Sequence, residues 1–356
     1  MSSNSFGNLF KVTTFGESHG GNLGAVVDGV PAGLRLTEEM IDRDLSLRRP
    51  GKSAFSTARQ EADKVAIVSG VFEQTTLGTP VAMLFENRDA RSDDYDRLKD
   101  LFRPGHADWT YEQKYGRRDW RGGGRASGRE TVARVAAGAI AREILAPEGI
   151  AVVGATREIA GIRADFADHD LNLCRETPLR CPDAAAATKM EQAILQAKAA
   201  GDSVGGVVEV RATGVPAGLG EPVFDKLDAR LAGALMSIGA VKGVEVGDGF
   251  GLARLMGSES NDPLIPGERF SSNRAGGILG GISSGEEIVL RCAVKPTPSI
   301  QKEQTTVDRR GNPTQIQVKG RHDPCIVPRL IAVAEAMVLL TLVDALLLQR
   351  ARSDFF

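Results

Sequence analysis

The sequence predicts a mixed α+β fold in which a strand, turn and helix unit is used twice. Residues 16–34 and 201–219 align without a gap and share ten identical residues of nineteen. In both copies a glycine-rich turn precedes a β-branched run, a Gly-Val-Pro-Ala-Gly turn and a helical pattern. Such a repeat indicates that one supersecondary unit was duplicated. No low-complexity linker interrupts the chain, so we expect one domain over residues 1–356 rather than two halves divided near residue 185.

Hydrophobic periodicity predicts the further elements in chain order. Short apolar, β-branched runs indicate strands at 25–28, 65–71, 80–86, 151–156, 207–212 and 287–294. Apolar residues at helical spacing indicate helices at 37–47, 127–145, 188–200, 223–236 and at the C-terminus. Two long stretches rich in Gly, Pro and Arg lie between them, at 88–124 and 257–285. Loops of this length in a compact protein are usually functional or disordered.

The composition is that of a soluble globular protein, with 42% hydrophobic and 25% charged residues. The net charge of −2 argues against general nucleic-acid binding by the whole chain. The four cysteines lack CxxC spacing, which favours reduced thiols. The first residues lack the basic and apolar stretches of a signal peptide, so we expect a cytoplasmic protein.

One apolar run, residues 330–348, is nearly long enough to span a bilayer but carries Glu335 and Asp344. A buried or interface helix explains these charges better than a membrane span. A helix that is apolar on nearly every side must be covered all round by its own chain or by another subunit. We therefore expect an oligomer.

The turn at residues 16–21 reads GESHGG, and its counterpart at 201–206 reads GDSVGG. The glycines supply backbone freedom at tight turns in both copies. His19 has no such structural explanation, because the second copy has Val204 in its place. This asymmetry favours a chemical role for His19.

A local cationic segment lies between Arg103 and Arg134, with eight basic and four acidic residues and a net charge of +4. Within it, RGGGRASGRET places arginines among glycines where a helix begins, and backbone N–H groups at a helix start favour anions. The segment lacks the lysine of a Walker loop and the strand that precedes a dinucleotide fingerprint. By itself it predicts a site for phosphate or carboxylate.

Three further short segments carry chemistry-bearing residues. His106 lies in RPGHAD, where a polar loop histidine would be the simplest explanation. KPTPS at 295–299 has a Lys, a Thr and a Ser at a proline-stiffened turn, and GRHDPC places Asp323 before a proline. His169 resembles an ordinary loop residue, and we assign it no role.

Six segments in order resemble the chorismate synthase family: TTFGESHGG, RPGHADWTYEQKYG, RGGGRASGRET, GGILGGISSG, KPTPS and GRHDPC. The resemblance runs from residue 6 to about residue 350. It implies a catalytic domain with a β-α-β sandwich of internally duplicated units that assembles into a homotetramer. It also implies loss of phosphate from 5-enolpyruvylshikimate 3-phosphate to give chorismate, with reduced FMN (FMNH2) and no net redox change. Whether NADPH or an external reductase reduces the flavin stays open.

The resemblance also implies roles for individual residues. His19 would protonate the leaving phosphate, and His106 would face the reduced flavin. Flavin N5 would take up the proton lost from the substrate's ring carbon, with Asp323 helping as a base through Ser127. A substrate with one phosphate and two carboxylates calls for arginines. The matching positions for substrate or NADP are Arg48, Ala54, Arg103, Arg129 and Arg321.

The FMN contacts implied by the resemblance map onto twelve residues and no metal ligand. They are Arg125, Ala126, Ser127, Gly239, Ala240, Gly280, Lys295, Pro296, Thr297, Pro298, Ser299 and Arg321.

Four positions depart from the family pattern. Ala126, Gly239 and Pro298 each remove a side-chain hydrogen bond, so contacts at Ala126 and Gly239 would involve the backbone. Ala54 replaces a second arginine that would have formed a clamp with Arg48.

Two alternatives come from other classes. One is a non-catalytic anion-binding or assembly protein that kept the fold, and the other is an unrelated flavin oxidoreductase. A degenerate copy would have no physical reason to keep His19, His106 and Asp323. Phosphate release from substrate in the presence of reduced FMN separates all three.

Overall fold

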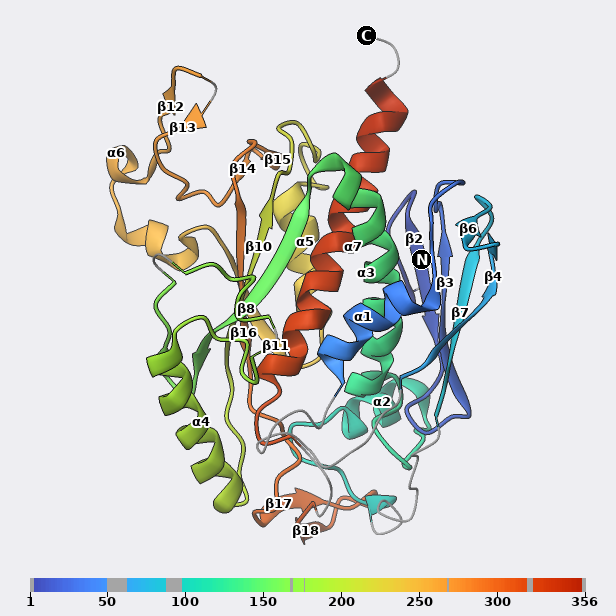
Figure 1. The fold of residues 1–356 in the computed structure, drawn as a ribbon. Helices are drawn as coiled ribbons and strands as arrows, with labels where there is room; N and C mark the ends of the chain where they lie inside the picture. Colours follow the sequence, from blue (N-terminus) through green and yellow to red (C-terminus); the bar gives the residue numbers. More distant parts are fainter. Residues whose placement is uncertain are drawn as a thin grey trace.

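The computed structural model describes residues 3–49, 63–87, 98–166, 169–175, 177–267, 269–318 and 323–353 (Figure 1). Two five-stranded antiparallel sheets organise this part of the chain. The first sheet has the order β1 (Ser5–Phe6), β2 (Lys11–Phe15), β3 (Asn22–Asp28), β7 (Val81–Glu86), β4 (Val65–Ser69). The second has the order β11 (Val241–Val246), β16 (Ile288–Val294), β10 (Gly206–Thr213), β8 (Ala151–Ile159), β9 (Ile162–Arg163).

The helices and four short strand pairs complete the described fold. The helices are α1 (Glu38–Arg48), α2 (Asp108–Tyr115), α3 (Thr131–Leu145), α4 (Ala184–Ala199), α5 (Leu227–Met236), α6 (Gly257–Ser260) and α7 (Val327–Ser353). The pairs are β5 (Val71–Phe72) with β6 (Thr75–Thr76), β12 (Leu264–Ile265) with β13 (Arg269–Phe270), β14 (Ile278–Leu279) with β15 (Ile282–Ser283), and β17 (Gln304–Val307) with β18 (Pro313–Ile316).

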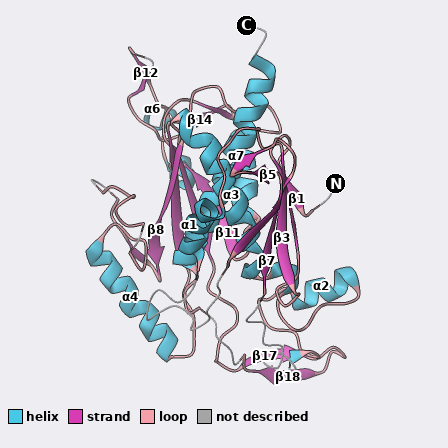
Figure 2. Ribbon diagram, turned by 45° about the vertical axis from the view of Figure 1, so that its right-hand side comes forward, coloured by secondary structure: helices cyan, strands magenta, loops and turns pink. Residues whose placement is uncertain are grey.

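Helices α1, α3 and α7 lie between the two sheets (Figures 1 and 2). α7 packs against α1, α3 and α5 and against β8 and β10. The mixed α+β class predicted from the sequence is therefore confirmed. Five predicted helices and six predicted strands have counterparts at similar positions, and the two expected long loops contain α2, α6 and β12 to β15.

The two copies of the repeat occupy matching places. β3 in the first copy and β10 in the second are each the third of five strands, with antiparallel neighbours on both sides. The predicted helix after the first copy is α1, whose N-cap Thr37 accepts a hydrogen bond from the Met40 N–H at 3.3 Å. The helix after the second copy is α5.

The apolar α7 is covered by its own chain, since 94% of its most apolar 18-residue stretch is buried. Of the two covers expected for this helix, its own chain or another subunit, the structure shows the first, because three helices and two strands of the same chain pack around it. This helix is long and apolar enough to cross a membrane by composition, and its burial identifies it as a core helix. The oligomer must therefore be argued from other features.

The two acids of α7 reach opposite sides of the molecule. Glu335 accepts hydrogen bonds from the Gly154 N–H of β8 at 2.8 Å and from Arg180 at 2.6 Å. Burial alone would raise the pKa of Glu335, but Arg180, Arg175 and Arg142 lower it below its ordinary value.

Asp344 binds the chain just before β2. Its carboxylate accepts hydrogen bonds from the backbone N–H groups of Asn8, Leu9 and Phe10 at 2.8–3.1 Å, and from Arg230 of α5. The two charges that argued against a membrane span are thus buried tethers between the helix and both sheets.

All four cysteines are free and buried. Burial raises the pKa of Cys174 to about 11 and the pKa of Cys292 and Cys325 to about 12. Thiols with such pKa values carry little thiolate at neutral pH, which makes them weak nucleophiles.

Gly138 explains how closely α3 and α7 approach. A Cβ at this position would lie 2.6 Å from the Cβ of Ala336 and 2.8 Å from its Cα. We expect Gly138→Ala to force the helices apart and to lower the free energy of unfolding by about 1–3 kcal/mol. Urea denaturation measures this change.

Gly233 of α5 is the matched control, because it is exposed and a Cβ there has no atom within 4 Å. Gly233→Ala should raise the free energy of unfolding by about 0.5–1 kcal/mol through helix propensity. Equal effects of the two substitutions would contradict the close helix approach.

Candidate active site

The glycine-rich turns of both repeat copies lie at the same edge of the molecule (Figure 1). The first turn joins β2 to β3, and β7 ends beside it because Glu86 pairs with Asn22. The second turn precedes β10, and β16 ends beside it because Val294 pairs with Gly206. Segments far apart in sequence therefore meet where these strands begin and end.

His19 packs against the glycine loop of residues 122–124. A Cβ at Gly122 would lie 2.3 Å from His19 Nδ1 and 2.6 Å from Ser18 Oγ, so any side chain there would displace the imidazole. Ser18 Oγ lies 3.2 Å from the same Nδ1. The glycine in this loop is thus required by the close approach of the histidine.

Arg103 lies beside this contact and is buried. Its Nε and Nη2 each donate to Asp108 at 2.7 Å, and Nη2 also donates to the Gly122 carbonyl at 3.2 Å. Burial alone would raise the pKa of Asp108, but hydrogen bonds and charge from Arg103, with a smaller contribution from Arg118, lower it. Arg103 is therefore held rigidly, and Asp108 neutralises part of its charge.

The His106 turn meets the 295–299 turn. The His106 N–H donates to the Arg103 carbonyl at 3.2 Å, and Lys295 Nζ donates to the Gly105 carbonyl at 2.8 Å. A Cβ at Gly105 would lie 3.0 Å from Pro298 Cβ. The structure thus brings together two motifs separated by about 190 residues.

Arg48 and Arg129 share one buried carboxylate. Asp63 accepts a hydrogen bond from Arg48 at 2.7 Å and another from Arg129, and its side chain is fully buried. Arg48 also donates to the Gly128 carbonyl at 3.3 Å, and Arg129 donates to Asn87 at 2.8 Å. The two arginines are therefore neighbours, and one negative charge lies between them.

Asp323 is buried and joins the same network through Arg329. Arg329 donates to Asp323 at 2.5 Å and to the backbone carbonyl of Arg48 at 3.1 Å. The second repeat turn supports this region, since the Val204 N–H donates to the Pro324 carbonyl at 2.8 Å. In the same turn Ser203 Oγ donates to the Thr297 carbonyl at 2.7 Å.

The segment after the glycine loop braces the first turn. Arg125 donates to the carbonyls of Gly16 and Thr14 at 3.2 and 3.1 Å. Ser127 Oγ accepts from the Arg129 N–H at 3.2 Å and caps the short helical turn that precedes α3. A Cβ at Gly239 would lie 4.0 Å from the Ala126 carbonyl, with open space otherwise.

Ala240 connects this corner to the 295–299 turn, because its carbonyl accepts from the Lys295 N–H at 2.9 Å. Gly280 lies elsewhere, between β14 and β15 and before β16, so the length of β16 separates it from Lys295. Seven strand residues span roughly 20 Å. Ala54 and Arg321 lie outside the described residues.

The 295–299 turn has the donors that a phosphate group requires. Thr297 Oγ1 is buried and has no hydrogen-bond partner among the described residues. Ser299 is buried, and Lys295 supplies a charge at the same turn. Such a set fits the phosphate of FMN. In the described ranges no group of three or more His, Cys, Asp and Glu side chains could hold a metal ion.

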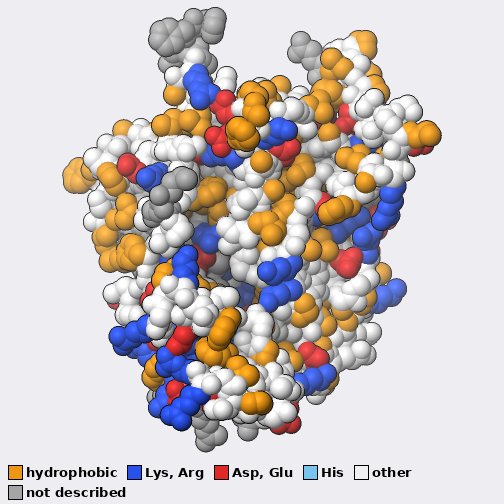
Figure 3. All heavy atoms as spheres, turned by 180° about the vertical axis from the view of Figure 1, so that it is seen from behind, with side chains coloured by type: hydrophobic (Ala, Val, Ile, Leu, Met, Phe, Trp, Pro, Cys, Tyr) orange, Lys and Arg blue, Asp and Glu red, His pale blue; other side chains and the backbone are white. Residues whose placement is uncertain are grey.

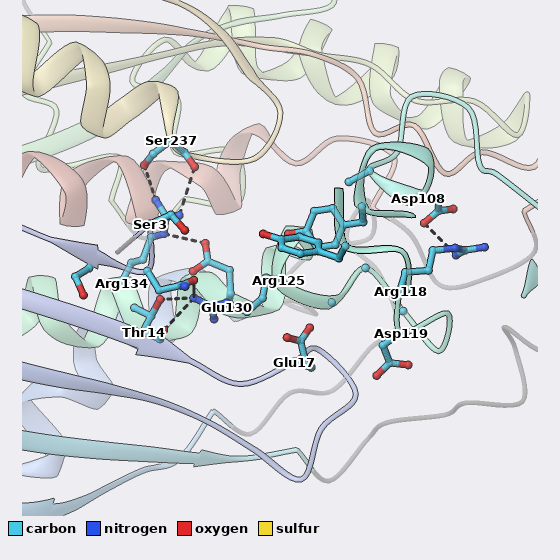
Figure 4. A pocket seen from close by; sticks show the side chains of 18 of the residues that line it. Ser3, Thr14, Glu17, Asp108, Arg118, Asp119, Arg125, Glu130, Arg134 and Ser237 are labelled. Carbon is cyan, nitrogen blue, oxygen red and sulfur yellow. Dashed lines mark hydrogen bonds and ion pairs between the residues drawn. The ribbon is translucent and has the colours of Figure 1, made fainter. Parts of the chain in front are cut away.

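A cavity of about 960 Å³ adjoins the glycine loop (Figure 4). Its lining includes Glu17, Tyr111, Trp120, Glu130 and, of the predicted site residues, Arg125. Burial raises the pKa of Tyr111, and the charges of Glu17 and Glu130 raise it further. The loop of residues 122–124 thus borders both the His19 contact and this cavity.

Sequence reasoning missed Asp63, Asn87 and Arg329, which connect the predicted residues to one another. Asn87 had one usable signal, since it directly follows a predicted strand. The partners of Asp63 and Arg329 become visible only in three dimensions.

Comparisons with known proteins give a consistent result. A family model described as chorismate synthase matches residues 10–347. Proteins named chorismate synthase from Syntrophobacter fumaroxidans, Nitratidesulfovibrio vulgaris and Chloroflexus aggregans are 58%, 57% and 56% identical to this chain. Each alignment covers 98% of this chain, and it covers 98%, 98% and 97% of the three relatives. A crystal structure of chorismate synthase is 32% identical, with a TM-score of 0.76 over 99% of this chain and 95% of that one.

The Arg103–Asp108 pair predicts a pH-dependent stability difference. Asp108→Asn should lower the free energy of unfolding by about 3 kcal/mol at neutral pH, because a buried arginine loses its carboxylate. Since the pKa of Asp108 is lowered from 3.8, its stabilisation is complete above that value and is lost as the pH falls through the lowered pKa. The difference in the free energy of unfolding between wild type and Asp108→Asn should therefore become smaller only below pH 3.8.

The more exposed pair of Arg121 and Asp119 is the control for this measurement. Asp119→Asn should cost about 1 kcal/mol or less, since Arg121 is 48% exposed. Urea denaturation over a range of pH measures both variants. If the difference in the free energy of unfolding between wild type and Asp108→Asn stays constant down to the lowest accessible pH, the lowered pKa of Asp108 is contradicted.

Proposed function

The chain belongs to the chorismate synthase family, and we propose that the edge where the two glycine-rich turns meet is its active site. The family's reaction is the anti-1,4-elimination of phosphate from 5-enolpyruvylshikimate 3-phosphate to give chorismate, a carbon–oxygen lyase step of the shikimate pathway that leads to the aromatic amino acids. The observation that carries the proposal is the His19–Gly122–Arg103 contact. It joins a proton-donating side chain to a guanidinium group at a glycine loop.

His19 is the proposed donor of a proton to the leaving phosphate. Ser18 Oγ lies 3.2 Å from Nδ1, so we assign proton donation to Nε2. Protonation of the leaving oxygen lowers the cost of breaking the carbon–oxygen bond. Val204 at the equivalent place of the second repeat supports this role, because the turn itself does not require a histidine.

The proposed arginines hold the substrate's phosphate and two carboxylates. Arg48, Arg103 and Arg129 together carry three positive charges, and Asp63 and Asp108 offset two of them. We propose that protonated His19 and His106, with Lys295 and Arg321, supply the remaining positive charge. A preorganised cluster of this kind binds anions without reorganising during the reaction.

FMN is the proposed cofactor, and the chemistry of the 295–299 turn supports it. Lys295, Thr297 and Ser299 would hold its phosphate, with Pro296 and Pro298 stiffening the turn. Arg125, Ala126, Ser127, Gly239 and Ala240 would line its ring, and the open space at Gly239 fits a backbone contact. Reduced FMN, when bound, supplies an electron-rich ring that assists loss of the substrate's ring proton. His106 would face that ring, and Asp323 would accept or relay the proton at its carboxylate.

The assembly and surroundings are further proposals. We propose a cytoplasmic homotetramer, each chain being one catalytic domain with a β-α-β sandwich derived from duplicated units. The matching central strands β3 and β10 support the duplication. Exposed apolar side chains support an interface, among them Phe224, Phe250 and Met256, which are 94%, 76% and 73% exposed. Figure 3 shows further apolar side chains on the rear face.

We also propose NADPH as the reductant of the flavin, and the test is flavin reduction by NADPH without added reductase.

His19→Ala should reduce turnover by about two orders of magnitude or more and leave the fold nearly unchanged, because a general acid is lost from a turn that tolerates Val. The measurement is phosphate release from substrate with chemically reduced FMN. His169→Ala is the control, since His169 is exposed, and it should keep wild-type turnover. Retained activity in His19→Ala would refute the role, and the assay also distinguishes this chain from a non-catalytic relative.

Flavin and substrate should bind interdependently, because both anions share one set of cations and cover each other. Substrate should therefore raise the affinity for FMN in the wild type. His106→Ala should impair turnover with reduced flavin and still bind oxidised FMN. The measurement is FMN titration with and without substrate. An FMN affinity that substrate leaves unchanged would contradict a joint site.

A further inference from the structure

Asn87 occupies a junction of the active site that the family reaction does not explain. It follows β7, whose last residue Glu86 pairs with Asn22 at the start of β3. Its backbone N–H donates to the Gly21 carbonyl at 3.1 Å. The strand pairing therefore brings Asn87 beside the turn that carries His19.

The side chain of Asn87 binds this turn on both sides of His19. Nδ2 lies 2.9 Å from the Gly20 carbonyl oxygen, 3.2 Å from that of Ser18 and 3.4 Å from that of Glu17. Carbonyl oxygens only accept hydrogen bonds, so the NH2 end of the amide must face the turn.

The other end of the same amide holds Arg129. Asn87 Oδ1 accepts from Arg129 Nε at 2.8 Å, and a guanidinium group only donates. The amide orientation is thus required by both partners. Arg129 binds Asp63 through a different nitrogen, so two groups restrain its guanidinium.

The turn needs such a restraint. Residues 16–21 contain three glycines, which leave the backbone free, and the turn closes on itself through the Gly20 N–H to Glu17 carbonyl bond at 3.0 Å. A proton donor must lie within a few tenths of an ångström of its productive position. Asn87 links the backbone on either side of the donor to a cation proposed to bind the substrate.

We propose that Asn87 is a positioning residue that holds His19 and Arg129 in a fixed relation for proton donation to the bound substrate. This inference rests on the proposed function of His19. The amide of Asn87 would thereby link the proposed proton donor, His19, to Arg129, which is proposed to bind the substrate.

Two substitutions separate the two ends of the amide. Asn87→Asp keeps an acceptor for Arg129 but replaces the donor to the turn with a carboxylate oxygen that repels three carbonyls. We expect kcat to fall 10- to 100-fold with KM changed less than 3-fold. Asn87→Ala removes both ends, so kcat should fall to a similar extent and KM should rise about 10-fold.

The pH profile gives a readout that a purely structural role would not move. The new carboxylate of Asn87→Asp lies next to the His19 turn and favours the protonated imidazole. The basic limb of the kcat profile should therefore move to higher pH in Asn87→Asp and stay in place in Asn87→Ala. Asn22→Ala is the matched control, because Asn22 is an exposed asparagine on the neighbouring strand, and its kinetics should equal those of the wild type.

The outcomes separate this inference from the proposed function. If His19→Ala is inactive and Asn87→Asp keeps the wild-type kcat, the positioning role of Asn87 is overturned and the proposed role of His19 stands. An active His19→Ala would overturn the role of His19. If Asn87→Asp does not fold, Asn87→Ala decides, and an unchanged kcat in that variant overturns the inference.

Discussion

The two buried carboxylates of α7 hold both sheets to one helix. Glu335 binds β8 of the second sheet, and Asp344 binds the backbone just before β2 of the first. Removing one partner of a buried ion pair is strongly destabilising, so these two charges contribute to the relative position of the sheets together with apolar packing. The proposed active-site edge depends on that position, because His19 lies in the turn between β2 and β3 of the first sheet and the 295–299 turn follows β16 of the second. The two charges that interrupt the apolar run of α7 therefore help to align the two halves of the proposed site.

Buried carboxylates also bind arginines at the proposed active-site edge. Asp63 lies between Arg48 and Arg129, and Asp108 binds Arg103 on two nitrogens. Without these acids the arginines would repel one another and would lose the groups that orient them. With them, the cations are fixed in place before any ligand arrives, at the expense of part of their net positive charge. Oriented donors in a site shielded from water contribute more to anion binding than the formal charge suggests.

Local patterns in the sequence predicted five of the seven described helices and six of the eighteen described strands. Long-range contacts decided most of the rest. The helix predicted from apolar spacing at 37–47 is α1, which begins at Glu38 behind the N-cap Thr37. α2 was missed because DWTYEQKY has no apolar stripe, and its first residue is held instead by Arg103. β2 and β11 were not predicted either. β2 pairs with its sequence neighbours β1 and β3, whereas β11 gains its partner from the more distant β16. At the proposed site, the comparison of the two repeat copies pointed to His19 and the family resemblance to His106, whereas Asp63, Asn87 and Arg329 lie between the motifs. Four of the bonds that connect these residues to the motifs join positions 15 to 281 apart in sequence. The cover of α7 could not be predicted either, because a helix pattern does not specify which chain packs against it.

The burial of all four native cysteines has a practical consequence for spectroscopy. Because burial keeps Cys174, Cys292 and Cys325 protonated at neutral pH, maleimide and nitroxide reagents would encounter a surface without competing thiols. A single cysteine introduced at an exposed position such as His169 could then carry a fluorophore or spin label with the native cysteines left in place. Distances between such labels on two copies of the chain would test the proposed assembly in solution.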